Sequence, residues 1–94
     1  GKSAMLFMSI CKEKNSTAKE RIARRAKWQY PPGLKVLAEY WPQGSDIVVI
    51  NVVESDNVGL LMAALSDWDD LMQITVVPAV TAEDGLKLAA NMLK

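Results

Sequence analysis

The chain has 94 residues, half of them hydrophobic, and its 11 basic and 11 acidic side chains give a formal net charge of +0. This length predicts a single domain, which we place at residues 5–94, with residues 1–4 set apart as a vector-derived remnant ahead of a native start at Met5. The balanced charge argues against nucleic-acid binding, and no apolar run is long enough to predict a membrane span. A single cysteine, Cys11, excludes an internal disulfide and is typical of a cytoplasmic protein.

The first part of the chain predicts a strand followed by a helix. The apolar run Met5–Cys11 predicts the strand. Candidate N-caps at 15–17 precede a helix from Ala18 to about Gln29, which must end before the prolines at 31 and 32. Small apolar side chains at helical spacing are expected to pack this helix on a sheet. They are Ala18, Ile22, Ala23 and Ala26.

A hairpin follows. The alternating stretch Leu34–Trp41 predicts a second strand, and turn-forming residues 42–45 link it to Asp46–Glu54. This last segment is dominated by β-branched residues and predicts the central strand of a sheet. Asn51 interrupts it, and a buried amide is costly unless a partner hydrogen-bonds it.

The rest of the chain predicts a second helix, a fourth strand and a final helix. Residues 55–57 cap the second helix, the strand spans Leu71–Ala79, and Thr81 opens the C-terminal helix. This order is an α+β, ferredoxin-like βαββαβ arrangement with a C-terminal helix. The first and third strands take the centre of an antiparallel four-stranded sheet, and the two main helices cover one face.

Side-chain alternation divides the expected sheet into two rows. The nearly all-apolar row is predicted to lie under the helices: Leu6, Met8, Ile10, Val36, Ala38, Tyr40, Val48, Ile50, Val52, Met72, Ile74 and Val76. The other row mixes polar residues with apolar ones such as Phe7, Trp41 and Val49. Because that apolar surface needs a cover, we expect a homodimer through this sheet face.

The layout resembles a small uncharacterised ferredoxin-like family of the dimeric α/β-barrel superfamily. Three short motifs carry the resemblance, which covers most of Met5 to Leu93: Pro31-Pro-Gly-Leu-Lys-Val-Leu37, Trp68-Asp-Asp-Leu71 and Val76-Val-Pro-Ala-Val80. It implies that two sheets pack face to face into a barrel, in a superfamily that includes cofactor-independent monooxygenases, lactone isomerases and haem-degrading enzymes. The chain has no histidine, so we expect neither haem nor another cofactor, and no metal site.

The mixed row supplies the candidate site. Glu39 is the candidate base, with a pKa raised by an apolar barrel, and Asn51 is the candidate group that orients a ligand oxygen. The candidate ligand-binding residues are Phe7, Ser9, Trp41, Val49, Gln73 and Thr75. Together they predict a cofactor-free enzyme or binding protein for a small apolar, phenolic or enolisable carbonyl compound. The alternative is a structural or regulatory homodimer whose interior is filled by mutually hydrogen-bonded side chains.

Overall fold

The computed structural model describes residues 5–93. Its elements are β1 (Met5–Glu13), α1 (Ala18–Lys27), β2 (Lys35–Tyr40), β3 (Ile47–Ser55), α2 (Val58–Ser66), β4 (Met72–Ala79) and α3 (Ala82–Met92). All the expected helices and strands are therefore present. Residues 1–4, expected to be a remnant, lie outside the described part of the chain.

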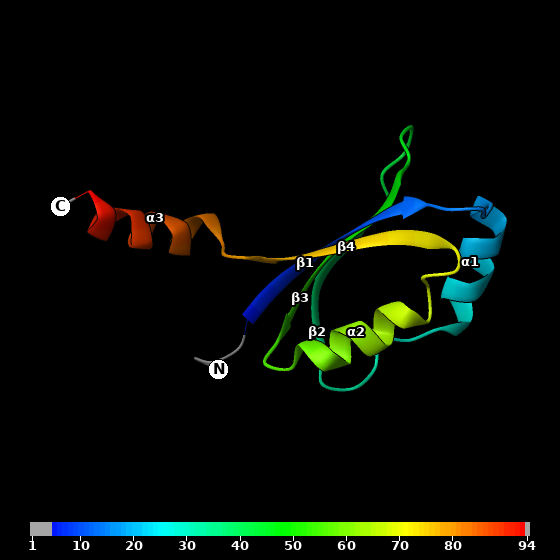
Figure 1. Ribbon diagram of the computed structural model, residues 1–94, viewed down its shortest axis with the longest axis horizontal. Coiled ribbons are helices and arrows are strands. Elements are labelled where there is room, and N and C mark those ends of the chain that lie inside the picture. Colours follow the sequence, from blue (N-terminus) through cyan, green and yellow to red (C-terminus); the bar gives the residue numbers. More distant parts are fainter. Residues whose placement is uncertain (1–4, 94) are drawn as a thin grey trace.

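The four strands form one antiparallel sheet in the order β2-β3-β1-β4. This confirms the ferredoxin-like α+β fold, with the first and third strands at the centre. Figure 1 shows α2 lying along one face of the curved sheet, while α1 stands at one end of it. Within residues 5–93, no helix covers the opposite face, which we call the open face. No helix in this range is long and apolar enough to cross a membrane.

Short-range signals start and stop the helices. The Thr17 hydroxyl accepts from the Glu20 backbone N–H at 3.2 Å, and the Glu20 carboxylate accepts from the Thr17 N–H at 2.8 Å. This reciprocal pair satisfies two amides that have no partner inside the helix. After α1, Gly33 has a φ of +99°, a conformation that L side chains rarely adopt.

The two rows of side chains in β1 and β3 are oriented opposite to the sequence expectation. Phe7, Ser9 and Cys11 are buried on the helix side, and Asn51 and Val53 pair with them in register. The apolar residues expected there lie on the open face instead: Leu6, Met8, Ile10, Ile50 and Val52. Both rows of these strands are largely apolar, so alternation alone cannot decide which one the helices cover.

The two edge strands, β4 and β2, differ in whether their side chains face the helices as expected. In β4, Met72, Ile74 and Val76 lie on the helix side as expected. In β2, the register shifts between Val36 and Ala38. An extra residue in one strand reverses the facing of everything after it. Val36 and Glu39 therefore both face the helices, whereas Ala38 and Tyr40 lie on the open face.

The expected packing of α1 is also wrong. Its apolar stripe is exposed, with Ile22 at 51%. Arg24, Arg25 and Trp28 instead approach the body of the protein. These side chains are longer than alanine, so α1 stands away from the sheet and leaves space between them.

Candidate functional site

A cavity of about 260 Å³ lies between α1, the β2–β3 hairpin and one end of the sheet. Apolar walls come from the aromatic rings of Trp28, Trp41 and Trp68 and from Val49, Leu65 and Met72. The polar groups converge on one side of it: Arg25, Tyr30, Glu39 and Asn51. An apolar concavity with a few converging polar groups is the usual form of a small-molecule site.

Aromatic packing around Trp28 builds the wall next to α1. Trp28 adopts an extended backbone immediately after the helix, with φ −99° and ψ 143°. Its ring meets Trp68 edge-on at a centroid distance of 5.6 Å and Tyr30 at 4.8 Å. Its indole N–H donates to the Asp67 carboxylate at 2.9 Å. Such ring pairs add stabilisation beyond their buried area, so this cluster holds the chain after α1 in place.

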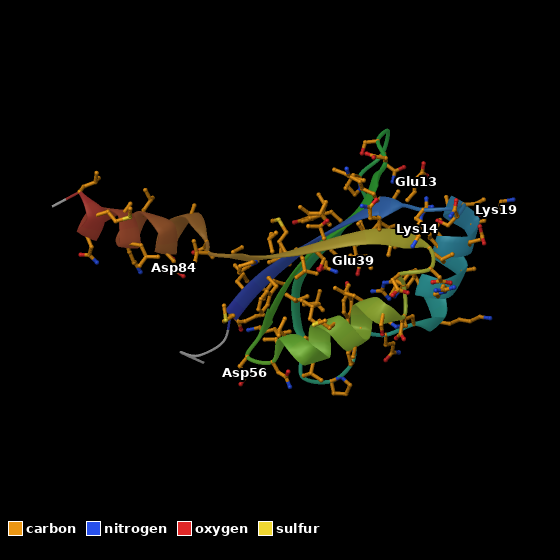
Figure 2. All side chains as sticks on the ribbon, in the orientation of Figure 1. Glu13, Lys14, Lys19, Glu39, Asp56 and Asp84 are labelled. Carbon is orange, nitrogen blue, oxygen red and sulfur yellow. The ribbon has the colours of Figure 1, made fainter. Side chains whose placement is uncertain are left out.

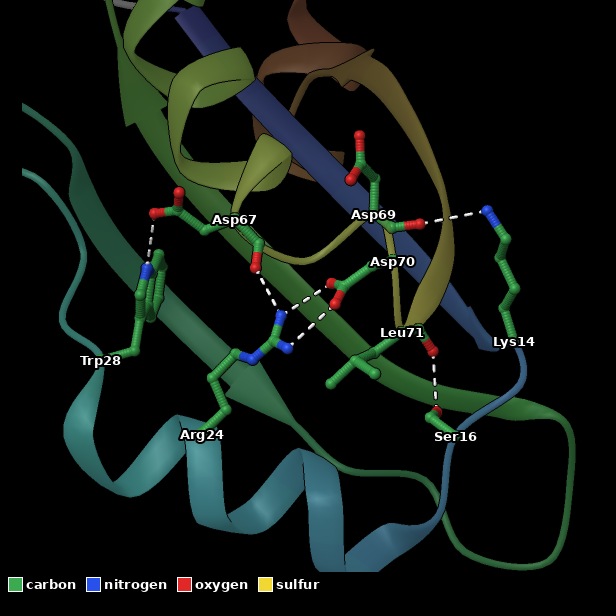
Figure 3. A network of polar contacts seen from close by, with 8 residues as sticks. All are labelled: Lys14, Ser16, Arg24, Trp28, Asp67, Asp69, Asp70 and Leu71. Atoms are coloured by element: carbon green, nitrogen blue, oxygen red, sulfur yellow. Dashed lines mark hydrogen bonds and ion pairs between the residues drawn. The ribbon is translucent and has the colours of Figure 1, made fainter.

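A second polar network fixes α1 to the connection between α2 and β4 (Figure 3). The Arg24 guanidinium donates to both carboxylate oxygens of Asp70, at 2.7 and 2.9 Å, and to the Asp67 carbonyl at 2.8 Å. This bidentate pair lowers the pKa of Asp70. The pair is largely solvent-exposed, so it orients the elements more than it stabilises them.

Glu39 is the centre of the polar side of the cavity. Figure 2 places it in the space between the sheet and the helices. Arg25 donates to both of its oxygens, at 3.1 and 3.2 Å. The Tyr30 hydroxyl and the Trp41 indole N–H each donate to it at 2.7 Å. The carboxylate is thus held by four hydrogen bonds, with only 15% of its side chain exposed.

These contacts reverse the expected ionisation of the site. Burial raises the pKa of Glu39, but the hydrogen bonds from Arg25, Trp41 and Tyr30 outweigh it, so the net pKa lies below the ordinary value. The expectation of a raised pKa was wrong. Burial and the nearby Glu39 charge raise the pKa of Tyr30, so its hydroxyl stays protonated. At neutral pH Glu39 is a stable anion and a weak base.

Asn51 lines the cavity and carries a buried, unused acceptor. The residue is 4% exposed, and its amide nitrogen donates to the Tyr30 hydroxyl at 3.4 Å. Its Oδ1 has no hydrogen-bond partner among residues 5–93, and the same is true of the Ser9 hydroxyl opposite it in the sheet. Leaving a buried acceptor unpaired costs about 1–3 kcal/mol. Asn51 therefore retains unused hydrogen-bonding capacity in this site.

Cys11 lies beside this polar group and is 1% exposed. Burial and the negative charge of Glu39 raise the pKa of its thiol to about 11. The thiol is therefore neutral at physiological pH, which makes it a poor nucleophile and an apolar part of the wall. Among the described residues, no group of three or more His, Cys, Asp or Glu side chains could hold a metal ion.

Residues 5–93 match the family described as Domain of unknown function (DUF3303). The chain belongs to this family. The matched range includes the whole sheet, all three helices and every residue of the cavity. No curated protein and no solved structure matches the chain.

The structure of this DUF3303 domain brings together only part of the expected site. Glu39, Asn51, Trp41 and Val49 line the cavity. Phe7 packs in the core with Val53 and Leu61, and Ser9 is fully buried.

Gln73 and Thr75 do not belong with the other candidate residues. Both are exposed and pair with Lys12 and Ile10 of the open face, on the other side of the sheet from the cavity. The side chains of β1 and β3 face opposite to the sequence expectation, whereas those of β4 face as expected. An error of one residue in the alternation of a strand moves all of its side chains to the other face. Gln73 and Thr75 were therefore grouped with side chains that they cannot reach.

Arg25 and Tyr30 are the main functional residues that sequence reasoning missed. They precede β2 and contact Glu39 from a helix and a loop, so strand alternation could not reveal them. One signal was present: the aromatic residues Trp28 and Tyr30 stand two apart immediately before Pro31. Large side chains crowded next to a rigid turn indicate a packed wall rather than a solvated loop.

Proposed function

We propose that this DUF3303 protein binds a small aromatic compound that donates a hydrogen bond, such as a phenol, in the cavity beside α1 and without a cofactor. One observation carries the proposal: Asn51 lines the cavity, and its buried Oδ1 has no donor among residues 5–93. A ligand hydroxyl that donates to this oxygen would remove the cost of burying it unpaired.

The walls and the volume suit one substituted ring. An engineered apolar cavity of about 150 Å³ takes up benzene, and the cavity here is about 260 Å³. Trp28, Trp41 and Trp68 offer faces and edges against which an aromatic ring packs favourably. Arg25 and Glu39 neutralise each other's charge across a 3.1 Å ion pair. An uncharged ligand therefore fits better than an anion or a cation.

Binding is favoured over proton abstraction. The sequence hypothesis placed a ligand oxygen between Asn51 and Glu39, and the Tyr30 hydroxyl occupies that position, 3.4 Å from the amide nitrogen and 2.7 Å from the carboxylate. In the enzyme alternative, a phenolic or enolisable carbonyl substrate displaces Tyr30 and gives its proton to Glu39. That route breaks a short hydrogen bond to an anion before any chemistry begins.

Calorimetric titration with phenol and with methoxybenzene tests this proposal, because the two rings differ in their ability to donate. We expect phenol to bind at least about tenfold more tightly, equivalent to about 1.4 kcal/mol. Asn51→Leu should abolish this preference while leaving the fold intact, since removing the unpaired buried acceptor offsets the loss of the long 3.4 Å hydrogen bond to Tyr30. Gln73→Leu is the matched control, an amide replaced on the open face. Equal affinity of the wild-type protein for the two rings would refute the proposal.

We also propose that the protein is a homodimer in which two open faces pack together, as in the dimeric α/β barrels. The open face presents Leu6, Met8, Ile10, Ile50, Val52 and Val77, so it is more apolar than the mixed row first expected at this interface. A solvated face of an antiparallel sheet normally alternates to polar residues. The cavity lies on the other side of the sheet and stays accessible in such a dimer. This surface also supports the alternative of a purely structural or regulatory dimer.

A further inference from the structure

Helix α3 is an amphipathic arm that extends away from the rest of the chain (Figure 1). It continues from the edge strand β4 through Val80 and Thr81. The apolar side chains of α3 are largely exposed, at 72% for Leu86, 57% for Leu88, 81% for Met92 and 86% for Leu93. Its polar residues Glu83, Asp84, Lys87 and Asn91 occupy one side at helical spacing. The remaining apolar face is wider than a helix normally leaves in water.

Helix α3 has no packing partner among residues 5–93. Within residues 5–93, α3 makes no extensive contact with any other helix or strand, and only Gly85 and Ala89 are even half-buried in it. Isolated helices shorter than about 12–15 residues are marginal in water, because nucleation is costly and tertiary packing supplies most of their stability. The 11 residues of α3 therefore need a surface to pack against.

We propose that α3 packs against a second copy of this chain, the same copy that covers the open face. This rests on the proposed dimer. The apolar surface of the open face runs along β4 through Val77 and Ala79 to Val80, which is 61% exposed, and so leads into α3. Charged pairs lie toward the ends of the sheet, Lys35 with Glu54 and Lys12 with Asp46, each at 4.0 Å. An apolar centre with a charged rim is the normal composition of an interface.

The size of the surface also favours an interface that includes α3, because the open face by itself is smaller than a stable dimer interface. Four strands of 6 to 9 residues at about 4.8 Å spacing and about 3.3 Å per residue make a face of roughly 500 Å². A stable interface buries about 800 Å² on each partner. Helix α3, about 16 Å long and about 10 Å wide, extends the same surface toward that size. A two-fold dimer would bury both copies of this arm.

Hydrogen exchange combined with light scattering tests whether α3 packs against a second copy. The arm variant carries Leu86→Glu and Leu93→Glu, the face variant carries Val52→Asp, and Asn91→Glu is a control that adds charge on the polar side of α3. We expect the arm variant to raise the dimer dissociation constant at least tenfold and to lose protection of the α3 amides. The control should match the wild type in both. In wild-type protein the α3 amides should lose protection on dilution into monomer.

The outcomes distinguish failure of the α3 proposal from failure of the proposed sheet-face dimer. If the arm variant weakens the dimer and the face variant does not, α3 packs against a second copy that leaves the open face uncovered, and both the sheet-face dimer and the joint arrangement proposed here are wrong. If the arm variant dimerises like the wild type, the arm proposal is wrong. Protection of α3 that persists in the monomer would also overturn it. That result would show α3 folding back into its own groove beside α2, which is lined by Val58, Met62 and Ile74.

Discussion

At the scale of single residues, Glu39 decides the electrostatics of the cavity. A carboxylate on a strand with apolar neighbours was expected to be hard to ionise, yet Arg25, Tyr30 and Trp41 all donate to it. Each of these donors stabilises the charged form, and their sum exceeds the effect of burial. The residue therefore organises the site as a fixed anion. Its removal would leave the Arg25 charge without its partner.

Glu39→Gln should destabilise the protein by about 1–2 kcal/mol at pH 7, because hydrogen bonds to a charged group are lost. The pKa of Glu39 is lowered by folding, so its contribution is complete above the ordinary carboxyl range, near pH 4–5. It is lost as the pH falls through the lower folded pKa. The difference between wild type and variant, measured by urea unfolding, should thus shrink toward pH 3.

Glu54→Gln is the control for this experiment, since that carboxylate lies 4.0 Å from Lys35 and is more exposed. It should change stability by less than about 0.5 kcal/mol. A Glu39→Gln difference that stays constant from pH 7 to pH 3 would contradict the assigned ionisation.

At the scale of elements, α1 is held by its end and its basic side rather than by its apolar stripe. Helical periodicity correctly predicted a helix here, and an apolar stripe of mostly small residues at 18, 22, 23 and 26 indicated a close approach to the sheet. The structure turns Arg24, Arg25 and Trp28 inward instead, because Asp70, Glu39 and Trp68 receive them. The space that results under α1 is the cavity.

Two substitutions distinguish these ways of holding α1. Trp28→Ala should lower the free energy of unfolding by about 2 kcal/mol, less than a fully buried Trp→Ala because Trp28 is only half-buried. Ile22→Ser, at a position that is 51% exposed, should cost less than about 1 kcal/mol. Chemical denaturation of the two variants at equal protein concentration measures both. A larger loss for Ile22→Ser would mean that the apolar stripe holds α1 after all.

At the scale of the whole molecule, the open face and α3 are apolar surfaces that residues 5–93 of one chain leave uncovered. The cavity and both main helices lie away from the open face. Val49, which sequence alternation placed in a dimer seam, lines the cavity instead, and Val52 takes the position at the open face. Val52 is therefore the position at which a charge should disrupt the proposed dimer.

Gel filtration with light scattering should give about twice the monomer mass at micromolar concentration for the wild-type protein. Val52→Asp should give the monomer mass, because it sets a charge without a partner in the interface. Met62→Asp is a matched control, since Met62 is apolar and 65% exposed but belongs to α2 on the other side. Circular dichroism checks that the variants are folded. A wild-type protein that is monomeric at this concentration would contradict the dimer.

Local sequence determined the elements and their order. The local signals act on neighbours only a few residues away, so they can be recognised without a structure. They are capping residues such as Thr17 and Asn57, the prolines after α1 and the β-branched run of β3. The strand order followed from the handedness of the connections. Asn51 and Glu39 were also assigned to one row of the sheet, and both line the cavity, although the roles expected for them were those of an orienting group and a base.

Only the tertiary structure decided which face of the sheet the helices cover. In β1 and β3 the two rows are both apolar, so their difference in burial free energy depends on the helix that meets them and not on the strand itself. The β2 bulge then brought Glu39 to the helix side, where Arg25 and Tyr30 reach it from segments 14 and 9 residues away in the chain. Contacts between separate elements have no local pattern, and the ionisation of Glu39 depends entirely on them.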